Sequence, residues 1–255
     1  MVAVGRDRVG LEETARGERS IDVVEADVTE PAGQASVFQG RRRLHALVND
    51  AGVGWTGLVE DMPLEEIDRI IALNVSALIR LTRLALERLG DGGHIVNIGS
   101  VLGLVASPPL TVYSASKFAV RGFSQGLRRE LAGRGISVTE IRPGPVDTAF
   151  FTRSVQRPAA ADIPSFPMFD PDRVAAAVRR ALERPGWPGY RTISVPRAAA
   201  LSHLGALAGG NALVDALARV TRSDAVLRPG PARGHAGPTS AGRAGSPGAI
   251  RPPER

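Results

Sequence analysis

The sequence predicts an α/β fold in which helices cover both faces of a parallel sheet, within a single domain that is followed by a disordered C-terminal tail. Short apolar runs alternate with longer helical patterns as far as about residue 196, which is the rhythm of β-α-β units. The runs are rich in Val, Ile and Leu, as strands buried on both faces are. With 255 residues, 43% of them hydrophobic, the chain can bury one large core.

Six segments have the length and composition of buried strands. They are residues 2–4, 21–25, 44–48, 94–98, 136–141 and 192–195. Two long helices are predicted between them. Residues 64–89 carry apolar side chains at three- and four-residue steps, and Asn74 interrupts this stripe. Residues 113–131 carry a stripe of small residues, which permits another helix to approach closely, either within the fold or across a subunit interface. The stripe consists of Ala115, Ala119, Gly122 and Gly126.

The pattern weakens after residue 196, where we place the end of the domain over residues 1–196. Residues 197–226 are rich in Ala and Leu and predict a helical segment. A peripheral membrane contact is an open alternative for this segment, although its polar face is too weakly charged to require one. Residues 227–255 consist mainly of Pro, Gly, Arg and Ser, with almost nothing to bury, and predict a disordered tail.

The composition excludes several classes of function. The chain has no Cys, and its four His never stand three or four positions apart, which argues against thiolate sites and helical metal pairs. The formal net charge is +6, but no basic stripe alternates with aromatic residues, so we expect no nucleic-acid partner. No signal peptide is recognisable, and no apolar run reaches the ~18 residues of a membrane span. The expected compartment is the cytoplasm.

Tyr113 and Lys117 stand four positions apart at the start of the second predicted helix, so their side chains share one face. An ammonium group within ~4–6 Å of a phenol favours the phenolate, so we expect Lys117 to lower the pKa of Tyr113 from its usual value of about 10. The phenol then becomes a usable proton donor and acceptor. Because the same spacing occurs by chance in many helices, the pair alone is weak evidence.

An apolar segment ends in a hydroxyl upstream of this pair. Residues 95–98 are followed by Gly99 and Ser100, and Ser100 precedes Tyr113 by 13 positions. Ligands bind at the carboxyl ends of parallel strands. At this point the sequence resembles the short-chain dehydrogenase/reductase family, whose active site combines a strand-end Ser, a Tyr-x-x-x-Lys helix and a helix-borne Asn. In this sequence the pattern falls on Asn74, Ser100, Tyr113 and Lys117.

Further motifs of the family follow in order, and the resemblance covers roughly residues 2–196. The matching residues are Asp27 and Val28 at the family's adenine contact, Asn49, Asp50, Ala51 and Gly52 at its Asn-Asn-Ala-Gly turn, and Pro143, Gly144, Val146 and Thr148 at its nicotinamide carboxamide contact. Outside the family, Pro143 and Gly144 would be an ordinary turn, and Thr148 a helix N-cap.

The resemblance implies an NAD(P)(H)-dependent oxidoreductase with a Rossmann-like, doubly wound sheet, which interconverts an alcohol and a carbonyl by hydride transfer. Tyr113 is then the general acid–base. Lys117 lowers the pKa of the phenol and holds the nicotinamide ribose. Ser100 stabilises charge on the substrate oxygen, and Asn74 binds a water that links Lys117 to solvent. Without the family, Ser100 would be an N-cap and Asn74 a buried amide bonded to nearby backbone.

The choice of cofactor depends on the residue after the first apolar run. Arg6 stands where family members that prefer NADP often carry a basic residue for the 2′-phosphate, and Gly5 stands where NAD-preferring members often carry an acid. NADP(H) is therefore expected rather than NAD(H). Asp7 counts against this expectation, and Arg6 alone would be a surface charge.

The segment after Thr148 predicts the substrate class. It contains an apolar set that would cover a pocket for an apolar alcohol or ketone, although ordinary loop packing explains the set equally well. Its members are Phe150, Phe151, Phe166, Met168 and Phe169. The two long helices also resemble the family's subunit interface, which implies a homodimer or homotetramer.

The sequence departs from the family where the cofactor pyrophosphate binds. Family members begin with a strand and a Thr-Gly-x-x-x-Gly-x-Gly turn, whereas residues 2–6 already look like the second strand. A βα unit of roughly 30 residues would be missing, and the sheet would have a gap. Two alternatives stay open: a start upstream of Met1, or a non-catalytic remnant that works as a binding or interaction protein.

Overall fold

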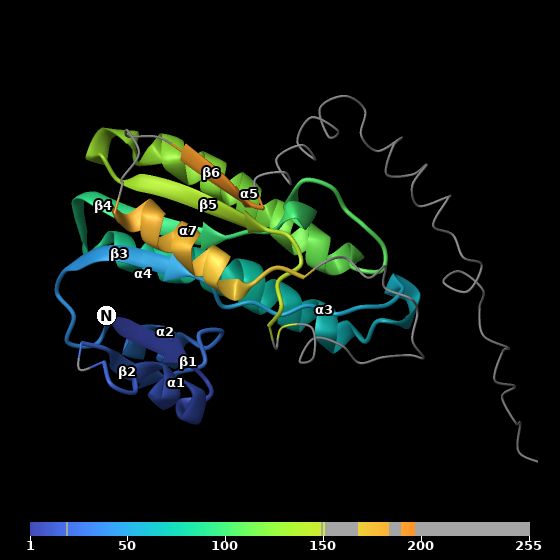
Figure 1. Cartoon of the computed structure of the whole chain (residues 1–255), viewed down its shortest axis with the longest axis horizontal. Helices are drawn as coiled ribbons and strands as arrows, with labels where there is room; N and C mark the ends of the chain where they lie inside the picture. The colour runs from blue at the N-terminus through green and yellow to red at the C-terminus, as the bar shows by residue number, and fades with distance from the viewer. Residues whose placement is uncertain (19, 149, 151–167, 184–189, 197–255) are drawn as a thin grey trace, which may run out of the picture.

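The structure, a computed structural model, describes residues 1–18, 20–148, 150, 168–183 and 190–196 (Figure 1). Six parallel strands alternate with helices, which confirms the α/β fold. The strands are β1 (Val2–Gly5), β2 (Asp22–Glu25), β3 (Leu44–Asn49), β4 (Leu89–Ile98), β5 (Ser137–Pro143) and β6 (Tyr190–Val195). The main helices are α1 (Arg8–Ala15), α2 (Pro31–Phe38), α3 (Leu64–Ile71), α4 (Leu78–Leu86), α5 (Thr111–Glu130) and α7 (Pro171–Glu183). The predicted segments 197–226 and 227–255 lie outside the described residues.

The larger sheet has the order β3-β4-β5-β6, and helices cover both of its faces (Figure 1). Ile95 of β4 packs in one buried cluster with Ala85 of α4 and Leu127 of α5. The next residue, Val96, points to the opposite face and packs with Ala177 of α7. All seven residues of β5 are buried, because this strand lies between β4 and β6 and under helices on both sides. The prediction of strands buried on both faces is confirmed here.

The smaller sheet consists of β1 and β2, and among the described residues neither strand pairs with the larger sheet. The two sheets are separate in Figure 1, as a gap in a single sheet implies. Helix α2 joins them, because Val37 and Phe38 are buried in the same cluster as Leu81 of α4. By contrast, α1 has no buried residue.

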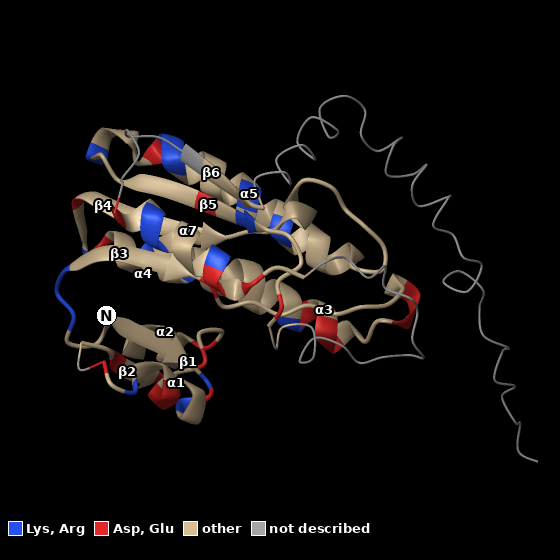
Figure 2. Cartoon of the chain, viewed as in Figure 1, with Lys and Arg blue, Asp and Glu red and all other residues tan. Residues whose placement is uncertain are grey.

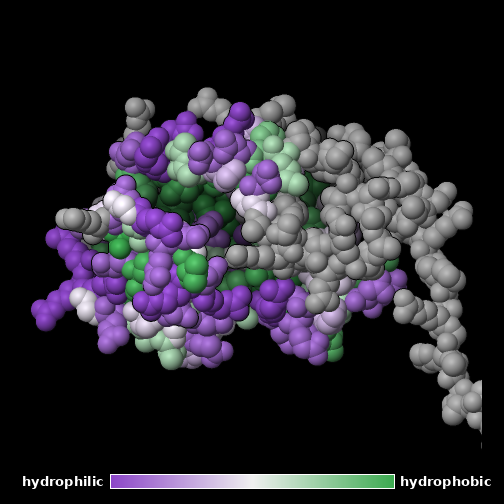
Figure 3. All heavy atoms as spheres, turned by 60° about the horizontal axis from the view of Figure 1, so that its bottom comes forward, coloured by the Kyte–Doolittle hydropathy of each residue, from purple (hydrophilic) through white to green (hydrophobic). Residues whose placement is uncertain are grey.

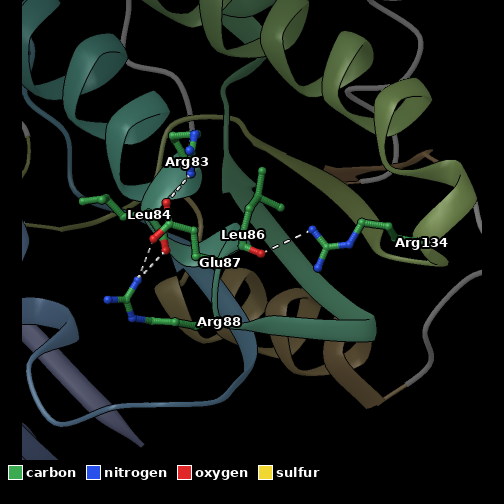
Figure 4. A network of polar contacts seen from close by, with 6 residues as sticks. All are labelled: Arg83, Leu84, Leu86, Glu87, Arg88 and Arg134. Atoms are coloured by element: carbon green, nitrogen blue, oxygen red, sulfur yellow. Dashed lines mark hydrogen bonds and ion pairs between the residues drawn. The ribbon is translucent and has the colours of Figure 1, made fainter.

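The predicted helix over residues 64–89 is interrupted and ends earlier than expected. Between α3 and α4 lies a π-helical turn, η2 (Ala72–Ala77), which contains Asn74. The helix ends at Leu86, and Leu89 already belongs to β4. Arginine side chains bind the free carbonyl groups at this end (Figure 4): Arg88 donates to Leu84 at 2.9 Å, and Arg134 donates to Leu86 at 3.3 Å.

Basic and acidic residues are interspersed along the described helices, strands and loops (Figure 2). On the face seen in Figure 3, hydrophobic side chains gather in a hollow that hydrophilic residues border. One exposed apolar residue of the strands is Val48 of β3, which is 39% exposed although its neighbour in the sheet, Val96, is buried. Within the described ranges, no helix has the length and apolar character needed to span a membrane.

Candidate active site

The predicted site residues come from adjacent parallel strands and from the helix that begins beside them. β3, β4 and β5 are neighbours, so their carboxyl ends meet at one edge of the sheet. Ser100 follows β4, and α5 begins at Thr111 after the connecting loop. The described structure places Tyr113 and Lys117 in the first turns of α5 with both side chains buried. An edge of this kind is where α/β sheets bind ligands.

Ser100 is both a helix N-cap and a neighbour of Tyr113, which are the two roles that the sequence left open. Its hydroxyl accepts a hydrogen bond from the backbone of Leu102 at 3.1 Å, which makes it the N-cap of the short helix η3 (Val101–Gly103). The same hydroxyl lies close enough to the phenol of Tyr113 to lower the pKa of that phenol. Capping η3 therefore fixes the hydroxyl that contacts the reactive phenol.

Tyr113 is 9% exposed, and the burial of its side chain has the largest effect on the pKa of the phenol. Burial raises the pKa of Tyr113 to about 12, and the hydrogen bond from Ser100 only partly opposes this change. The expectation that Lys117 lowers the pKa below its usual value is not met in this structure. The neutral phenol is therefore the form present near neutral pH.

Lys117 is held beside the phenol by the strand edge. Its Nζ donates to the carbonyl of Ile98 at 2.9 Å and lies 5.6 Å from the centre of the Tyr113 ring. Burial lowers the pKa of Lys117 to about 8, while the carboxylates of Asp50 and Glu140 raise it. A Cβ on Gly103 would lie 2.8 Å from the backbone oxygen of Lys117, so only glycine lets η3 approach α5 this closely.

Asn74 is fully engaged with protein groups. Its Oδ1 accepts from the backbone of Val53 at 2.9 Å, and its Nδ2 donates to the carbonyl of Val53 at 2.8 Å and to the hydroxyl of Ser116 at 3.0 Å. The side chain therefore joins the loop after β3 to α5. This is the buried amide that the sequence offered as the simpler interpretation, and the water link to Lys117 stays a prediction. π-Helical turns are frequent at functional sites.

The predicted turn after β3 divides into a structural and an open part. Asn49 is buried, and its Nδ2 donates to Thr82 at 3.0 Å and to Asn97 at 2.9 Å. Ala51 is exposed. A Cβ on Gly52 would lie 3.4 Å from Oδ1 of Asn74 and 3.8 Å from Nζ of Lys117, so the backbone of Gly52 lies close to both side chains. Asn49 thus joins the turn to the buried side chains of Thr82 and Asn97, and Gly52 brings it close to Asn74 and Lys117.

The predicted adenine side is formed at the ends of β1 and β2. A guanidinium nitrogen of Arg6 lies 3.5 Å from a carboxylate oxygen of Asp27, and both side chains are partly exposed. Asp27 also accepts hydrogen bonds from the backbone and hydroxyl of Thr29, at 2.9 and 2.6 Å. These bonds, and then Arg6, lower the pKa of Asp27. The side chain of Val28 packs in the core next to α2.

The predicted carboxamide segment is attached to two other parts of the chain. Gly144 donates to the carbonyl of Val195 at 2.8 Å, and Val146 forms a bridge to Phe169, whose own N–H donates to Pro145 at 2.8 Å. This fixes the backbone that follows Pro143 at the end of β5.

Thr148 and Phe150 continue this segment toward the reactive groups. The hydroxyl of Thr148 accepts from the backbone of Phe150 at 3.3 Å, as a helix N-cap does. The ring of Phe150 lies 5.5 Å from the ring of Tyr113. Phe150 is thus beside the reactive phenol, whereas Phe151 and Phe166 lie outside the described residues.

These residues are better suited to the nicotinamide and adenine ends of a dinucleotide than to the pyrophosphate between them. Lys117 is a buried donor close to Gly52 at one end, and Arg6 with Asp27 offers a polar pair at the other end. A pyrophosphate needs free backbone N–H groups at a helix N-terminus. At the start of α1, however, the carboxylate of Asp7 already accepts from Gly10 at 3.1 Å. Within the described ranges, no group of three acidic or His side chains is arranged to hold a metal ion.

A buried ion pair near Lys117 was missed at the sequence level. Glu140 and Arg142 of β5 are 0% and 2% exposed, and their side chains lie 2.6 Å apart. A sequence signal existed, because two charged residues flank Ile141 in a strand predicted to be buried on both faces. Ser116, which contacts Asn74, carried no such signal.

A parallel sheet with helices on both faces and polar residues at the carboxyl ends of its strands is the architecture of dinucleotide-binding α/β proteins. A model of the short chain dehydrogenase family matches residues 2–159. An uncharacterized oxidoreductase of Staphylococcus aureus strain MW2 is 31% identical over 203 residues, which cover 76% of this chain and 85% of that protein. The chain therefore belongs to the short-chain dehydrogenase/reductase family, a family of oxidoreductases.

Two solved structures are similar to this chain. A short-chain dehydrogenase from Sphingobium yanoikuyae in complex with NADPH has a TM-score of 0.67 and 29% identity, covering 87% of this chain and 86% of its own. A 3-ketoacyl-(acyl-carrier-protein) reductase from Brucella melitensis, complexed with NADH, shares the fold with a TM-score of 0.65 and 23% identity, covering 76% and 85%. An NAD(P)-type cofactor is thus supported for the family fold.

Proposed function

We propose that this protein interconverts an alcohol and a carbonyl compound by hydride transfer with a nicotinamide cofactor, and that Tyr113 is its general acid–base. The observation that carries the proposal is the grouping of three side chains at the carboxyl edge of the sheet: Tyr113 and Lys117 are buried beside each other, and the hydroxyl of Ser100 lies near the phenol. Cofactor-binding roles are proposed for the family-motif residues that follow β1 and β2 in the smaller sheet and for those at the carboxyl edge of the larger sheet. They are Arg6, Asp27, Val28, Asn49, Ala51, Gly52, Tyr113, Lys117, Pro143, Gly144, Val146 and Thr148.

The protonation states favour a reductive half-reaction at neutral pH. A bound nicotinamide cofactor would supply the hydride to the substrate carbon. With a pKa of about 12, Tyr113 carries its proton and donates it to the oxygen of the carbonyl substrate. The hydroxyl of Ser100 donates to the same oxygen and stabilises its developing charge. Lys117, when protonated, favours the phenolate left behind and offers a donor to the cofactor ribose.

NADP(H) is the proposed cofactor in preference to NAD(H). Support comes from Arg6 at the end of β1, whose guanidinium group is partly exposed beside Asp27. A cation at this position is suited to a ribose 2′-phosphate. The ring of Phe150 against Tyr113 supports an apolar alcohol or ketone as substrate.

A homodimer or homotetramer in the cytoplasm is also proposed. The small-residue stripe of α5 supports self-association, because Ala115 and Ala119 are exposed and a Cβ on Gly122 or Gly126 would meet nothing within 4 Å. The stripe is therefore not used within the described fold. Phe118, on the same helix, is 38% exposed.

Replacement of Tyr113 by Phe tests the proposal directly. Tyr113→Phe removes the proton donor and keeps the ring, so we expect turnover to fall by about 10³-fold or more. Binding of NADPH and NADH, followed by fluorescence titration, is expected to change less than about threefold, with NADPH bound more tightly in both proteins.

Two outcomes would contradict this proposal. Turnover that survives in Tyr113→Phe would remove the residue as acid–base. Failure of the unaltered chain to bind either nucleotide would favour the alternative of a non-catalytic binding or interaction protein, for which the separate β1–β2 sheet is the supporting observation.

A further inference from the structure

We propose that Ser116 is a positioning residue, whose hydroxyl holds Tyr113 in place by tying the first turn of α5 to Asn74 in the π-helical turn η2. The effect on turnover rests on the proposed function, but the positioning itself does not. Ser116 lies between Tyr113 and Lys117 in the sequence and takes no part in the proposed proton transfer.

The hydroxyl of Ser116 lies between two specific groups. It donates to the backbone carbonyl of Tyr113 at 2.7 Å and accepts from Nδ2 of Asn74 at 3.0 Å. A hydroxyl has a single O–H donor, so the bond to Tyr113 directs its lone pairs toward the amide. Ser116 is 0% exposed, so water cannot readily replace either bond.

Asn74 connects this hydrogen bond to a distant segment of the chain. Its remaining donor and its oxygen are both bonded to the backbone of Val53, in the loop after β3. The hydrogen bonds therefore run from that loop, through the amide of Asn74 and the hydroxyl of Ser116, to the backbone of Tyr113. Through this chain η2 and the loop after β3 constrain the residue that bears the reactive phenol.

Loss of the hydroxyl would act on both ends of this chain. Ser116→Ala leaves a buried N–H of Asn74 without its acceptor, which is costly in a site closed to water. It also removes the hydrogen bond from the Ser116 hydroxyl to the backbone carbonyl of Tyr113. Because acid–base groups need placement within about 0.5 Å, a small displacement of the first turn of α5 is enough to weaken proton transfer.

Ser114 provides a matched control on the same helix. It is also 0% exposed, and its hydroxyl donates to the carbonyl of Leu110 at 2.8 Å. Ser114→Ala thus removes a buried hydroxyl of the same kind, whose bond runs to the backbone at the beginning of α5. A difference between the two variants isolates the link to Asn74 from the general cost of a buried Ser→Ala change.

The first readout is the environment of the phenol, which needs neither cofactor nor substrate. The chain has two tyrosines, Tyr113 and Tyr190, so Tyr190→Phe leaves one tyrosine signal. In the full chain labelled with ¹³Cζ-tyrosine, we expect one sharp resonance in this background and in Ser114→Ala. We expect a shifted or multiple resonance in Ser116→Ala and an intermediate result in Ser116→Cys, which keeps a weak donor and acceptor.

Turnover is the second readout. With NADPH and a panel of apolar ketones, we expect kcat to fall about 10- to 100-fold in Ser116→Ala with KM nearly unchanged, and less than about twofold in Ser114→Ala. Identical tyrosine resonances in the Ser116→Ala and Ser114→Ala variants would overturn the positioning role. If the unaltered chain showed no turnover while the resonances differed as expected, the proposed function would fail and the positioning of Tyr113 would stand.

Discussion

Strand β5 and the two strands of the smaller sheet, β1 and β2, are all parallel strands, but they differ in how deeply their residues are buried. Every residue of β5 is buried, including the charged pair Glu140 and Arg142. All four residues of β1 are only partly buried, and two of the four in β2 are exposed. The region that carries the proton-transfer groups is thus built into a core, whereas the proposed adenine side lies on a small, shallow sheet.

The comparison shows where each half of the site obtains its rigidity. Around β5, buried polar groups bond to one another, as Asn97 does with Asn49 and Ser124, both at 2.9 Å. Such networks favour one arrangement, because each buried partner is costly to leave unpaired. Around β1, the polar contacts are at the surface, where ion pairs contribute little. Local opening should therefore begin in the β1–β2 unit.

The largest expected effect is at the buried ion pair. Glu140→Gln removes the carboxylate 2.6 Å from Arg142 while both side chains remain enclosed, so we expect the free energy of unfolding to fall by about 3–5 kcal/mol. Urea denaturation measures the change. Glu87→Gln, which breaks a 2.6 Å pair with Arg83 at the surface, is the control and should cost less than about 1 kcal/mol. Equal losses in the two variants would contradict the expected difference between a buried and a surface ion pair.

A smaller and opposite effect is expected at Lys117. The folded-state pKa is about 8 and the usual value 10.5, so between these pH values the unfolded chain binds more protons and stability rises with pH. Below pH 8 the full cost of burying the ammonium group remains. Lys117→Met should therefore abolish turnover yet raise the free energy of unfolding at pH 7 by about 1–3 kcal/mol.

The pH dependence sharpens this prediction. Chemical denaturation between pH 7 and 10 measures the difference in the free energy of unfolding between Lys117→Met and the unaltered protein. This difference should decrease as pH rises, because the lysine in the unaltered protein loses its charge. A difference that stays constant over this pH range would show that the buried ammonium group does not destabilise the unaltered protein.

The smallest expected effect is in the β1–β2 unit. Asp7 caps α1 through its bond to Gly10, so Asp7→Ala should cost about 1 kcal/mol locally. Hydrogen exchange should become faster in α1 and β1 but not in β5. Uniformly faster exchange across all strands would show that the two regions unfold together and that the comparison does not describe separate units.

The sequence was most informative where periodicity and motif spacing coincide. The six strands lie within a few residues of their predicted positions, because short apolar runs between helical segments are a strong local signal. The Tyr-x-x-x-Lys spacing on a helix, with a Ser at the end of the preceding strand, indicated which groups would meet. These features depend on local geometry, which a sequence pattern records directly.

Other features depend on contacts between distant segments and could not be read from the sequence. The π-helical form of η2 is accompanied by bonds from Asn74 to Val53 and Ser116, 21 and 42 positions away. The pKa of Tyr113 follows from how completely the fold removes the phenol from water, which spacing alone does not reveal. The predicted end of the helix at residue 89 was wrong because apolar periodicity continued into Leu89 of β4.

The π-helical turn also has a consequence for how this sequence can vary. A π turn accommodates one residue more than an α-helical turn over the same rise. Loss of one residue from Ala72–Ala77 would therefore let α3 continue into α4 as an ordinary helix, with little disturbance of the packing on either side. Asn74 would then lose its alignment with Val53 and Ser116. The site is thus sensitive to a deletion that the helix itself would tolerate.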